Sequence, residues 1–502
     1  MSVSLFKRIL VANRGEIAKR IFAACRELGI ASTAIYSEAD ADNSWWHSAD
    51  FAYPLTGSTA ADSYLNQAQI FSIAKSAGID AIHPGYGFLS ENADFAANCA
   101  KHGIKFIGPS PEAMRVMGSK ASAREVAVAA GVPVTPGVDG AGKSDADLAQ
   151  AAEQIGYPVL IKASAGGGGK GMRVVENSAE FTDALQAARS EAANSFGDDH
   201  IILEKFFTRI HHIEIQILGD EHGNAIHLFE RECSIQRRHQ KIIEETPSPT
   251  ISDTVRQQIA DAAVKLAQSV SYSSAGTVEF MYTGDGQFYL LEMNTRLQVE
   301  HPITELVTGI DLAKWQIRIA AGERLTIEQD DLAQNGHAIE CRVYAEDPAT
   351  NFLPSIGTIA HCAFPTMPNV RVDAGVATGS HVSTFYDPML AKVVAWGRDR
   401  QEAIERMIAA LRQTSIVGLT TNVPYLLAIL QEAHFQQGET TTRYLDDRFD
   451  GWRDSAEIDI DLLLAIAAYE LLGGRTTVQN TTAEATQPAD PWQTANRWRN
   501  LI

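Results

Sequence analysis

The first hundred residues alternate between short apolar runs and segments with one apolar face. Apolar strands are predicted at residues 9–12, 32–36 and 81–82, and amphipathic helices at 16–28 and 64–77. A repeated strand–helix order predicts a parallel sheet. The turn Asn13-Arg14-Gly15-Glu16 has one glycine where a dinucleotide-binding turn has three, so we interpret this region as a scaffold domain.

A glycine-rich run separates two later strands, predicted at residues 158–162 and 173–175. Such a run can be a plain linker, but Lys162 and Lys170 stand at its two ends. Its backbone N–H groups and these ammonium groups could close over phosphates. The Walker pattern is absent, so we predict a glycine flap over ATP. The following apolar strand, residues 201–207, suits a purine held by backbone hydrogen bonds.

A predicted β-hairpin places two carboxylates opposite each other. If Asp285-Gly286 forms a two-residue type I′ loop, Glu279 lies directly across from Glu292, with Cβ atoms about 5 Å apart. Like charges in this arrangement destabilise a sheet, so a cation between them is expected. Mg²⁺ uses one or two carboxylates plus phosphate oxygens. The alternative is an exposed hairpin with two solvated acids.

Polar groups gather directly after this hairpin. Asn294 offers a third oxygen ligand, Arg296 could bind a planar anion through two parallel hydrogen bonds, and Glu300 could take a proton from that anion. This density favours a catalytic site over the solvated hairpin.

Two further motifs have a structural and a functional interpretation. The basic run Arg237-Arg238-His239-Gln240-Lys241 is either a solvated loop or a site for triphosphate or a small oxyanion, and the acidic chain around it favours the anion site. The run His83-Pro84-Gly85-Tyr86-Gly87-Phe88 is either a tight turn or part of a ligand site, since open α/β sheets bind ligands at strand ends.

Composition narrows the class of protein. With 502 residues and 45% hydrophobic positions the chain can form several domains, and a net charge of -20 argues against a general nucleic-acid binder. Five cysteines without a C-x-x-C pair indicate reduced thiols. No signal core or membrane-length apolar run is found. We therefore expect a cytoplasmic protein that binds neither nucleic acid nor membrane.

Taken together, the motifs resemble those of the biotin carboxylase branch of the ATP-grasp superfamily, over roughly residues 5–448. The resemblance is carried by Ile82-His83-Pro84-Gly85-Tyr86-Gly87-Phe88-Leu89-Ser90-Glu91-Asn92, the glycine flap, the basic run, Glu292-Met293-Asn294 and Glu300-His301-Pro302. Within the family, the chain looks most like α subunits of 3-methylcrotonyl-CoA or related acyl-CoA carboxylases. This finer resemblance is carried by Thr308-Gly309-Ile310-Asp311-Leu312-Ala313-Lys314-Trp315-Gln316, Phe385-Tyr386-Asp387-Pro388-Met389 and Val417-Gly418-Leu419-Thr420-Thr421-Asn422.

The resemblance implies an α/β fold with an ATP-grasp core. It implies an N-terminal Rossmann-like domain at 1–118, an ATP-grasp domain at 119–325 with a lid at about 134–206, and a mixed α/β C-terminal domain at 335–448. Residues 449–502 would form a helix near 459–474, apolar nearly all round, then a linker and the start of a connector. No Met-Lys-Met biotin attachment sequence occurs, so we expect a truncated chain, with biotin on a separate carrier.

The resemblance also assigns roles to individual residues. It implies nucleotide binding by Lys120, Lys162, Gly168, Gly169, Glu204, Lys205, Phe207, His212, His239, Glu279 and Glu292. It implies Mg²⁺ or Mn²⁺ at Glu279, Glu292 and Asn294, and substrate contacts from Lys241, Arg296, Gln298, the Val299 backbone, Arg342 and Tyr86. The implied catalytic residues are Lys241, Arg296, Glu300 as the base and Arg342 on the biotin enolate; the alternative for Arg342 is a salt bridge to Glu346.

The implied reaction is ATP-dependent carboxylation of carrier-bound biotin with bicarbonate through carboxyphosphate. The implied partners are a biotin carboxyl carrier and a carboxyltransferase subunit, in a homo-oligomer or a hetero-oligomeric complex. Two alternatives stay open: another ATP-grasp ligase that joins a carboxylate to an amine, and a subunit that binds nucleotide without catalysis. The final acyl acceptor is not touched by this reaction, so the sequence does not identify it.

Overall fold

The computed structural model describes residues 5–163, 172–196, 199–238 and 240–454, together with Leu464, Ala467 and Ala468. The chain divides into two units, Met1–Arg453 and Asp454–Ile502. The glycine run and nearly all of the second unit, including most of the predicted helix at 459–474 and its connector, lie outside the described residues.

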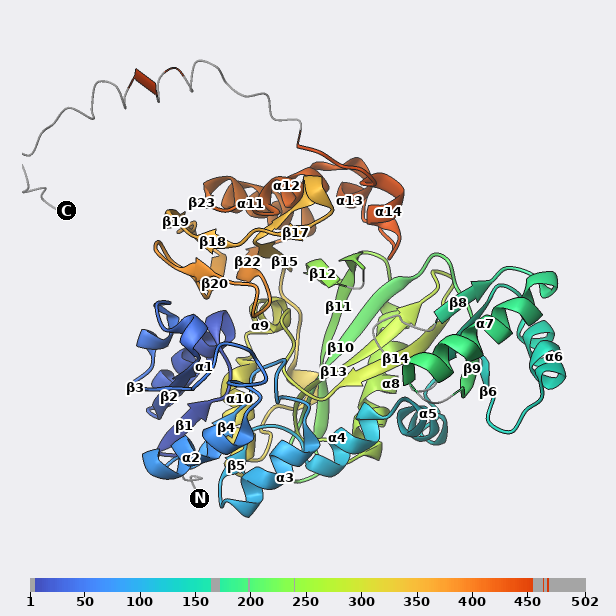
Figure 1. Ribbon diagram of the computed structural model, residues 1–502, viewed down its shortest axis with the longest axis horizontal. Helices are drawn as coiled ribbons and strands as arrows, with labels where there is room; N and C mark the ends of the chain where they lie inside the picture. The colour runs from blue at the N-terminus through green and yellow to red at the C-terminus, as the bar shows by residue number, and fades with distance from the viewer. Residues whose placement is uncertain are drawn as a thin grey trace, which may run out of the picture. The chain divides into compact units, whose positions relative to one another are not determined.

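The N-terminal region is the predicted parallel α/β sheet, drawn in blue in Figure 1. Its strand order is β3-β2-β1-β4-β5. The strands are β1 Arg8–Val11, β2 Ala31–Tyr36, β3 Phe51–Pro54, β4 Ala81–His83 and β5 Lys105–Phe106, and the helices are α1 Gly15–Glu27, α2 Gln67–Ala77, α3 Ala93–Lys101 and α4 Pro111–Gly118. Strand β3 was not predicted, and α2 begins later than predicted because the Asn66 side chain caps it by accepting from Gln69 N–H.

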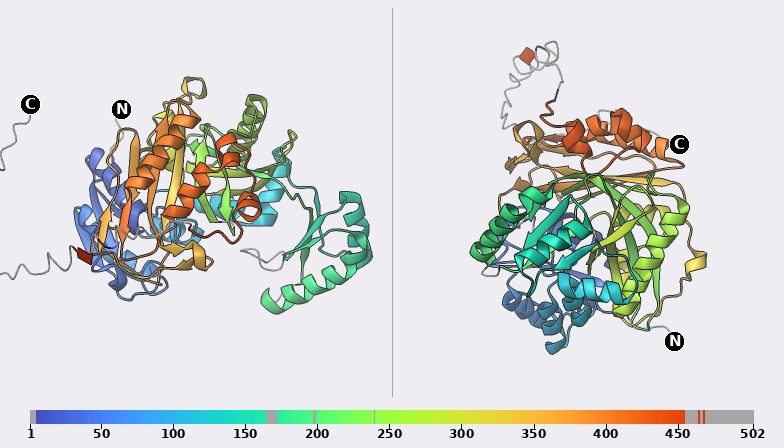
Figure 2. Two further views of the ribbon diagram at one scale, coloured as in Figure 1. Left: turned by 90° about the horizontal axis from the view of Figure 1, so that it is seen from above. Right: turned by 90° about the vertical axis from the view of Figure 1, so that its right-hand side faces the viewer.

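A small sheet of order β6-β9-β7-β8 forms a separate layer, which we call the lid. Its strands are β6 Gly137–Asp139, β7 Val159–Ala163, β8 Met172–Val175 and β9 Ile201–Lys205. Helices α6 Asp145–Ile155 and α7 Ser178–Phe196 pack on it through Leu148, Phe181 and Leu185 (Figure 2). Helix α5 Lys120–Ala129 precedes the lid.

An eight-stranded sheet of order β14-β13-β10-β11-β12-β15-β22-β20 runs through the rest of the chain. Its strands are β10 His211–Gly219, β11 Ala225–Arg237, β12 Gln240–Thr246, β13 Ser274–Tyr282, β14 Phe288–Asn294, β15 His337–Tyr344, β20 Val370–Ala374 and β22 Met389–Gly397. All its neighbouring strands are antiparallel. The sheet therefore joins the predicted ATP-grasp and C-terminal regions.

Strand alternation gives this sheet one apolar and one polar face. Ile213, Ile215 and Ile217 of β10 pack against α8 Asp253–Ser269, while His212 and Glu214 lie on the other face. Similarly, Ile339, Cys341 and Val343 of β15 pack against α11 Arg400–Gln413 and α12 Val423–Gln431. The polar face is partly covered by α9 His301–Thr308, which is followed by α10 Leu312–Ala320. Burial of one face thus fixes which side chains face the site.

Short elements complete the C-terminal region. They are β16 Glu346–Asp347, β17 Leu353–Pro354, β18 Gly357–Thr358, β19 His361–Ala363, β21 His381–Val382, β23 Ser415–Val417, α13 Ala433–Gln437 and α14 Tyr444–Arg448. Within the part of the chain that the structure describes, no helix combines the length and apolarity needed to cross a bilayer. All five cysteines are free thiols, as predicted.

The β13–β14 hairpin confirms the predicted pairing but not the predicted turn. Glu279 is opposite Glu292. However, Tyr282 pairs with Phe288, so residues 283–287 form the connection in place of a two-residue loop. The register shifts between Glu279 and Phe280, where Leu291 is the extra residue on β14. This bulge restores the opposed carboxylates that the longer loop would otherwise offset.

Candidate active site

Lys241 lies among three carboxylates on the polar face of the large sheet. Its Nζ donates to Glu214 Oε2 at 2.5 Å, Glu279 Oε1 at 2.9 Å and Glu300 Oε1 at 2.7 Å. Burial would lower the pKa of Lys241, but these three charges hold it well above its usual value. The ammonium stays charged and draws the carboxylates together. The basic run is thus not a solvated loop at this residue.

Glu300 is fully buried at the N-terminal end of α9, between two cations. Its Oε2 accepts from Arg342 Nη2 at 3.0 Å, whereas Lys241 donates to its Oε1. Burial would raise the pKa of Glu300, but the charges of Lys241, Arg342 and Arg231 hold it well below its usual value. Glu300 is therefore ionised at neutral pH and able to accept a proton.

Arg342 does not pair with Glu346, so that alternative was wrong. Its Nε donates to Glu244 Oε1 at 2.6 Å, and Arg237 pairs with Glu346 instead, at 3.3 Å. Arg342 lies on the face of β15 that looks toward α9, whereas Glu346 follows the end of that strand. The guanidinium group is thus held between Glu244 and Glu300.

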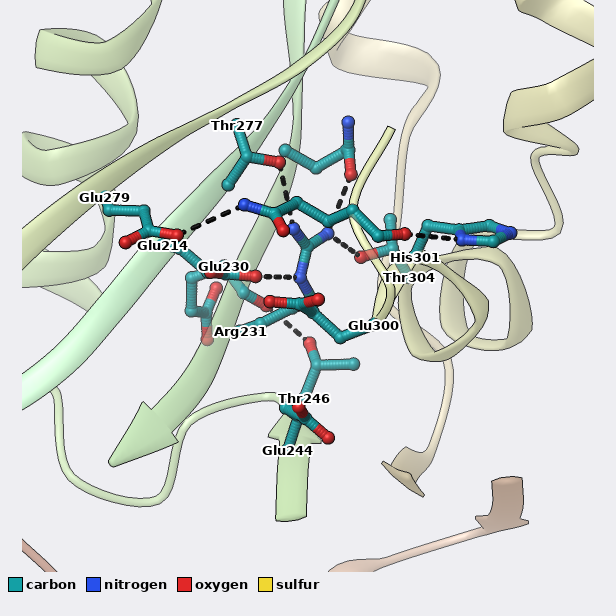
Figure 3. Close-up of polar contacts among 12 residues, drawn as sticks. Glu214, Glu230, Arg231, Glu244, Thr246, Thr277, Glu279, Glu300, His301 and Thr304 are labelled. Carbon is teal, nitrogen blue, oxygen red and sulfur yellow. Dashed lines mark hydrogen bonds and ion pairs between the residues drawn. The ribbon is translucent and has the colours of Figure 1, made fainter. Parts of the chain in front are cut away.

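A second buried arginine, Arg231, lies beside Glu214 and Glu300 (Figure 3). Arg231 donates to Glu214, and also to Gln216 at 2.7 Å, Thr304 at 2.9 Å and Thr277 at 3.0 Å. It is fully buried. Sequence reasoning missed Arg231; the only signal was charged residues within apolar strands, which are rarely buried without partners.

The carboxylates predicted to hold a metal lie together with neutral donors. Glu279 accepts from Asn294 Nδ2 at 2.8 Å and Gln298 Nε2 at 3.1 Å, and His212 Nε2 lies 3.0 Å from its Oε2. Despite burial, Lys241 and His212 lower the pKa of Glu279. Loss of hydration and the Glu279 charge raise the pKa of Glu292. Oxygen donors of this kind fit Mg²⁺ or Mn²⁺.

Arg296 connects this group with the N-terminal domain. Its Nε donates to Glu91 Oε2 at 2.9 Å, while Nη2 donates to Asn294 Oδ1 at 3.0 Å and Nη1 to Gln298 Oε1 at 2.9 Å. Glu91 belongs to the His-Pro-Gly-Tyr-Gly motif region, so two motifs distant in sequence meet at this guanidinium. To bind an anion through both nitrogens, Arg296 must release some of these partners.

The Val299 backbone is held by a lysine that sequence reasoning also missed. Lys392, fully buried on β22, donates from Nζ to Val299 O at 2.9 Å and lies 3.2 Å from Glu16 Oε2. The hydroxyl of Tyr86 donates to the same Glu16 side chain. Tyr86 and Val299 are therefore linked through Glu16 and Lys392.

The residues predicted to bind nucleotide are divided between the two sheets. Lys162 and Glu204 form an ion pair in the lid, and Lys205 donates to Gly156 O and Tyr157 O at 2.9 and 3.0 Å. Phe207 stacks on Tyr289 of β14, with ring centroids 5.4 Å apart. Lys120 begins α5. His212, Glu279 and Glu292 lie on the large sheet, and Gly168, Gly169 and His239 lie outside the described residues.

Comparisons with known proteins cover the whole of this region. Residues 5–114 match the family model of the biotin carboxylase N-terminal domain, residues 119–328 that of the carbamoyl-phosphate synthase L chain ATP-binding domain, and residues 340–447 that of the biotin carboxylase C-terminal domain. Biotin carboxylase 2 of Bacillus subtilis is 50% identical over 441 residues, covering 88% of this chain and 99% of that protein.

Longer relatives match as well. The mitochondrial methylcrotonoyl-CoA carboxylase subunit alpha of Rattus norvegicus is 49% identical over 439 residues, which are 87% of this chain and 61% of that subunit. The biotin carboxylase domain of Hydrogenobacter thermophilus 2-oxoglutarate carboxylase, solved with MgADP, ADP and bicarbonate, superposes with a TM-score of 0.84 at 46% identity over 90% of this chain and 100% of that one.

Proposed function

The chain belongs to the biotin carboxylase family, and on that premise we propose that it carboxylates carrier-bound biotin at the expense of ATP and bicarbonate. The observation that carries the proposal is the buried carboxylate of Glu300 between Lys241 and Arg342. This arrangement combines a base with two cations that stabilise negative charge on a small oxyanion.

In the first step, Glu300 accepts the bicarbonate proton while a bicarbonate oxygen attacks the γ-phosphorus and the bond to ADP breaks. This forms carboxyphosphate and ADP. Lys241, Arg296, Gln298 and the Val299 N–H would orient bicarbonate, and Lys392 holds the Val299 peptide through its carbonyl. Because Glu300 is already ionised, no proton has to leave it before turnover.

In the second step, carboxyphosphate breaks its carbon–oxygen bond to give CO₂ and phosphate. The phosphate takes the N1′ proton of biotin, and the resulting enolate attacks CO₂ through N1′. Arg342 would stabilise the enolate, a charge that exists only during the reaction. Tyr86 would contact biotin.

We further propose the residues that hold ATP. These are Lys120, Lys162, Gly168, Gly169, Glu204, Lys205, Phe207, His212, His239, Glu279 and Glu292. Glu279, Glu292 and Asn294 would hold Mg²⁺ or Mn²⁺, which would neutralise phosphate charge. Asn294 must then turn its oxygen away from Arg296. The domain boundaries predicted above are kept as part of this proposal.

The physiological role we propose is the α component of an acyl-CoA carboxylase, working with a biotin carboxyl carrier and a carboxyltransferase in an oligomeric complex. The rat relative supports this role, although the chain spans only 61% of its length. A pyruvate carboxylase subunit of Methanothermobacter thermautotrophicus is 50% identical, so identity alone does not select the acceptor. Five free thiols favour a reducing compartment such as the cytoplasm.

A single assay separates these functions. The chain is incubated with ATP, Mg²⁺, bicarbonate and free biotin, and ADP release and carboxybiotin are measured. ADP release that requires bicarbonate and rises with biotin supports the proposal. ADP release that requires a different carboxylate and an amine indicates another ATP-grasp ligase, and nucleotide binding without turnover indicates a non-catalytic subunit.

A further inference from the structure

Two buried glutamates lie side by side on the polar face of the large sheet, outside the reaction described above. Glu244 of β12 is directly paired with Glu340 of β15, and both are fully buried. Cβ atoms of directly opposed residues are about 5 Å apart, so their carboxyl groups are within reach of each other. Two ionised carboxylates in this position would repel strongly.

Glu340 has apolar neighbours on the side away from the site. Its partner on β22 is Val394, and Ala338 lies two residues before it on the same face. Both pack against Ile303 and Val307 of α9. Among the described residues, neither oxygen of Glu340 has a hydrogen-bond partner. A buried carboxyl group without such partners is stable only in its neutral form.

Glu244 has a different environment on its outer side. Its Oε1 accepts from Arg342 Nε at 2.6 Å, whereas its Oε2 has no hydrogen-bond partner within the described part of the chain. Oε1 of Glu244 thus accepts a hydrogen bond from the Arg342 guanidinium, and Oε2 can accept one from another donor. The hydroxyl of a protonated Glu340 is the donor that the strand pairing supplies.

We propose that Glu244 and Glu340 share one proton, so that the pair carries a single negative charge and holds Arg342 between itself and Glu300. Burial raises the pKa of Glu340 well above 4.5 and that of Glu244 to about 7. The charged or titratable groups that face the pair are Lys241 on β12, Arg342 on β15, Lys392 on β22, Glu300 before α9 and the Cys233 thiol on β11.

The shared proton has a consequence for catalysis, which rests on the proposed function. With one charge, the pair balances Arg342, whose Nη2 lies 2.5 Å from Glu244 Oε1 and 3.0 Å from Glu300 Oε2. With two charges, the pair would draw the guanidinium toward itself and away from the site. Glu244 and Glu340 are then positioning residues that act through Arg342.

The proton can be detected without turnover. Infrared spectra of the ligand-free protein at pH 8 should contain the carbonyl stretch of a protonated carboxyl group, and Glu340→Gln should lack it. Glu245→Gln is the matched control, because Glu245 is the neighbouring buried carboxylate but is ionised, its pKa held near 2 by His337 and Arg400 despite burial. An unchanged band in Glu340→Gln, or loss of the same band in Glu245→Gln, overturns the proposal.

Stability gives a second test, with Glu340→Leu as the substitute if the amide variant does not fold. Glu340 is neutral in the native state but ionises above pH 4.5 in the unfolded state. The free energy of unfolding therefore falls as pH rises from 4.5 toward the native pKa of Glu340. Glu340→Gln and Glu340→Leu should remove this fall and raise Tm at pH 8. A lower Tm in both variants would show that Glu340 is ionised and paired, against the proposal.

The effect on Arg342 is tested by comparing two activities. Glu244→Gln should lower kcat for biotin carboxylation about tenfold more than kcat for bicarbonate-dependent ADP release, since misplacing a catalytic group costs rate. Glu340→Gln should keep activity to higher pH than the wild type because its amide cannot ionise. Equal losses of both activities in Glu244→Gln, with the wild-type pH profile in Glu340→Gln, would reduce the pair to a packing role. The infrared test needs no turnover, so it can support or contradict the shared proton even if the proposed biotin carboxylation is not observed.

Discussion

Arg342 Nη2 lies 3.0 Å from Glu300 Oε2, while Lys241 Nζ lies 2.7 Å from the other oxygen of the same carboxylate. Each oxygen of Glu300 therefore has its own cation. A substrate anion that replaces Glu300 at either cation also frees one carboxylate oxygen to accept a proton. Under the proposed mechanism, binding of bicarbonate and activation of the base are then the same exchange of partners.

We expect Glu300→Gln to bind ATP normally but to lose bicarbonate-dependent turnover, because the amide keeps the shape and removes the base. Loss of a general base costs about 10²–10⁴-fold. ATP binding is measured by calorimetry and turnover by ADP release. The control is Glu405→Gln, on the exposed side of α11. Near-normal turnover of Glu300→Gln at neutral pH would remove Glu300 from the mechanism.

Arg342→Ala should damage carboxybiotin formation more than biotin-independent ADP release, since the enolate forms after phosphoryl transfer. Arg296→Ala should impair both activities, because poorly oriented bicarbonate loses the first step as well. The two activities are measured in parallel for each variant. If Arg342→Ala lowers both equally, its main role is to hold Glu300 and bicarbonate, as the contact with Glu300 also allows.

For the metal site, Glu292→Gln should make ATP affinity less dependent on Mg²⁺. The ligand-free hairpin should be no less stable, because a repulsive pair with Glu279 is relieved. ATP is titrated at several Mg²⁺ concentrations, with Asp285→Asn in the hairpin connection as the control. The same Mg²⁺ dependence in the wild type and in Glu292→Gln would show that this carboxylate holds no metal.

Glu245→Gln should lower the free energy of unfolding at pH 7. Despite burial, His337 and Arg400 lower the pKa of Glu245 from 4.5 to about 2, which corresponds to about 3 kcal/mol. Because the pKa of Glu245 is lower in the native state than in the unfolded state, its ionised carboxylate stabilises the fold at pH values above 4.5. This stabilisation is lost as pH falls from 4.5 to about 2. The gap between wild type and variant should therefore be about 1 kcal/mol smaller at pH 4 than at pH 7. Urea unfolding at both values measures it, and an equal gap would contradict the assignment.

The sequence predicted best what lies close together along the chain. The parallel sheet and the opposition of Glu279 and Glu292 follow from local apolar alternation and pairing. The predicted two-residue turn was wrong. The longer connection shifts the strand register by one residue, and the bulge at Leu291 shifts it back, so that Glu279 still lies opposite Glu292. Such compensation leaves no periodic signal.

Partners brought in by distant strands could not be predicted. Arg231 stands between two glutamates on β11, and Lys392 is the single charge of β22. Only the pairing of β10 with β11 brings Glu214 to Arg231, and only the packing of α1 and β20 brings Glu16 and Asp373 to Lys392. Glu346 was predicted as the alternative partner of Arg342 because the two residues are close in sequence. In the structure, Arg342 pairs with Glu244 of the neighbouring strand β12 instead. Long-range pairing therefore decides the charge balance of the site.

The residues proposed to bind ATP are divided between the lid sheet and the eight-stranded sheet. Lys162 and Glu204 lie in the lid, but the carboxylates proposed for the metal lie on the large sheet. Under the proposed assignment, one ATP molecule bridges two layers that are otherwise joined by contacts such as Phe207 on Tyr289. ATP is then a structural link as well as a reactant: part of its binding energy would set the distance between the layers, while Lys241 and Arg342 stay on strands of one continuous sheet.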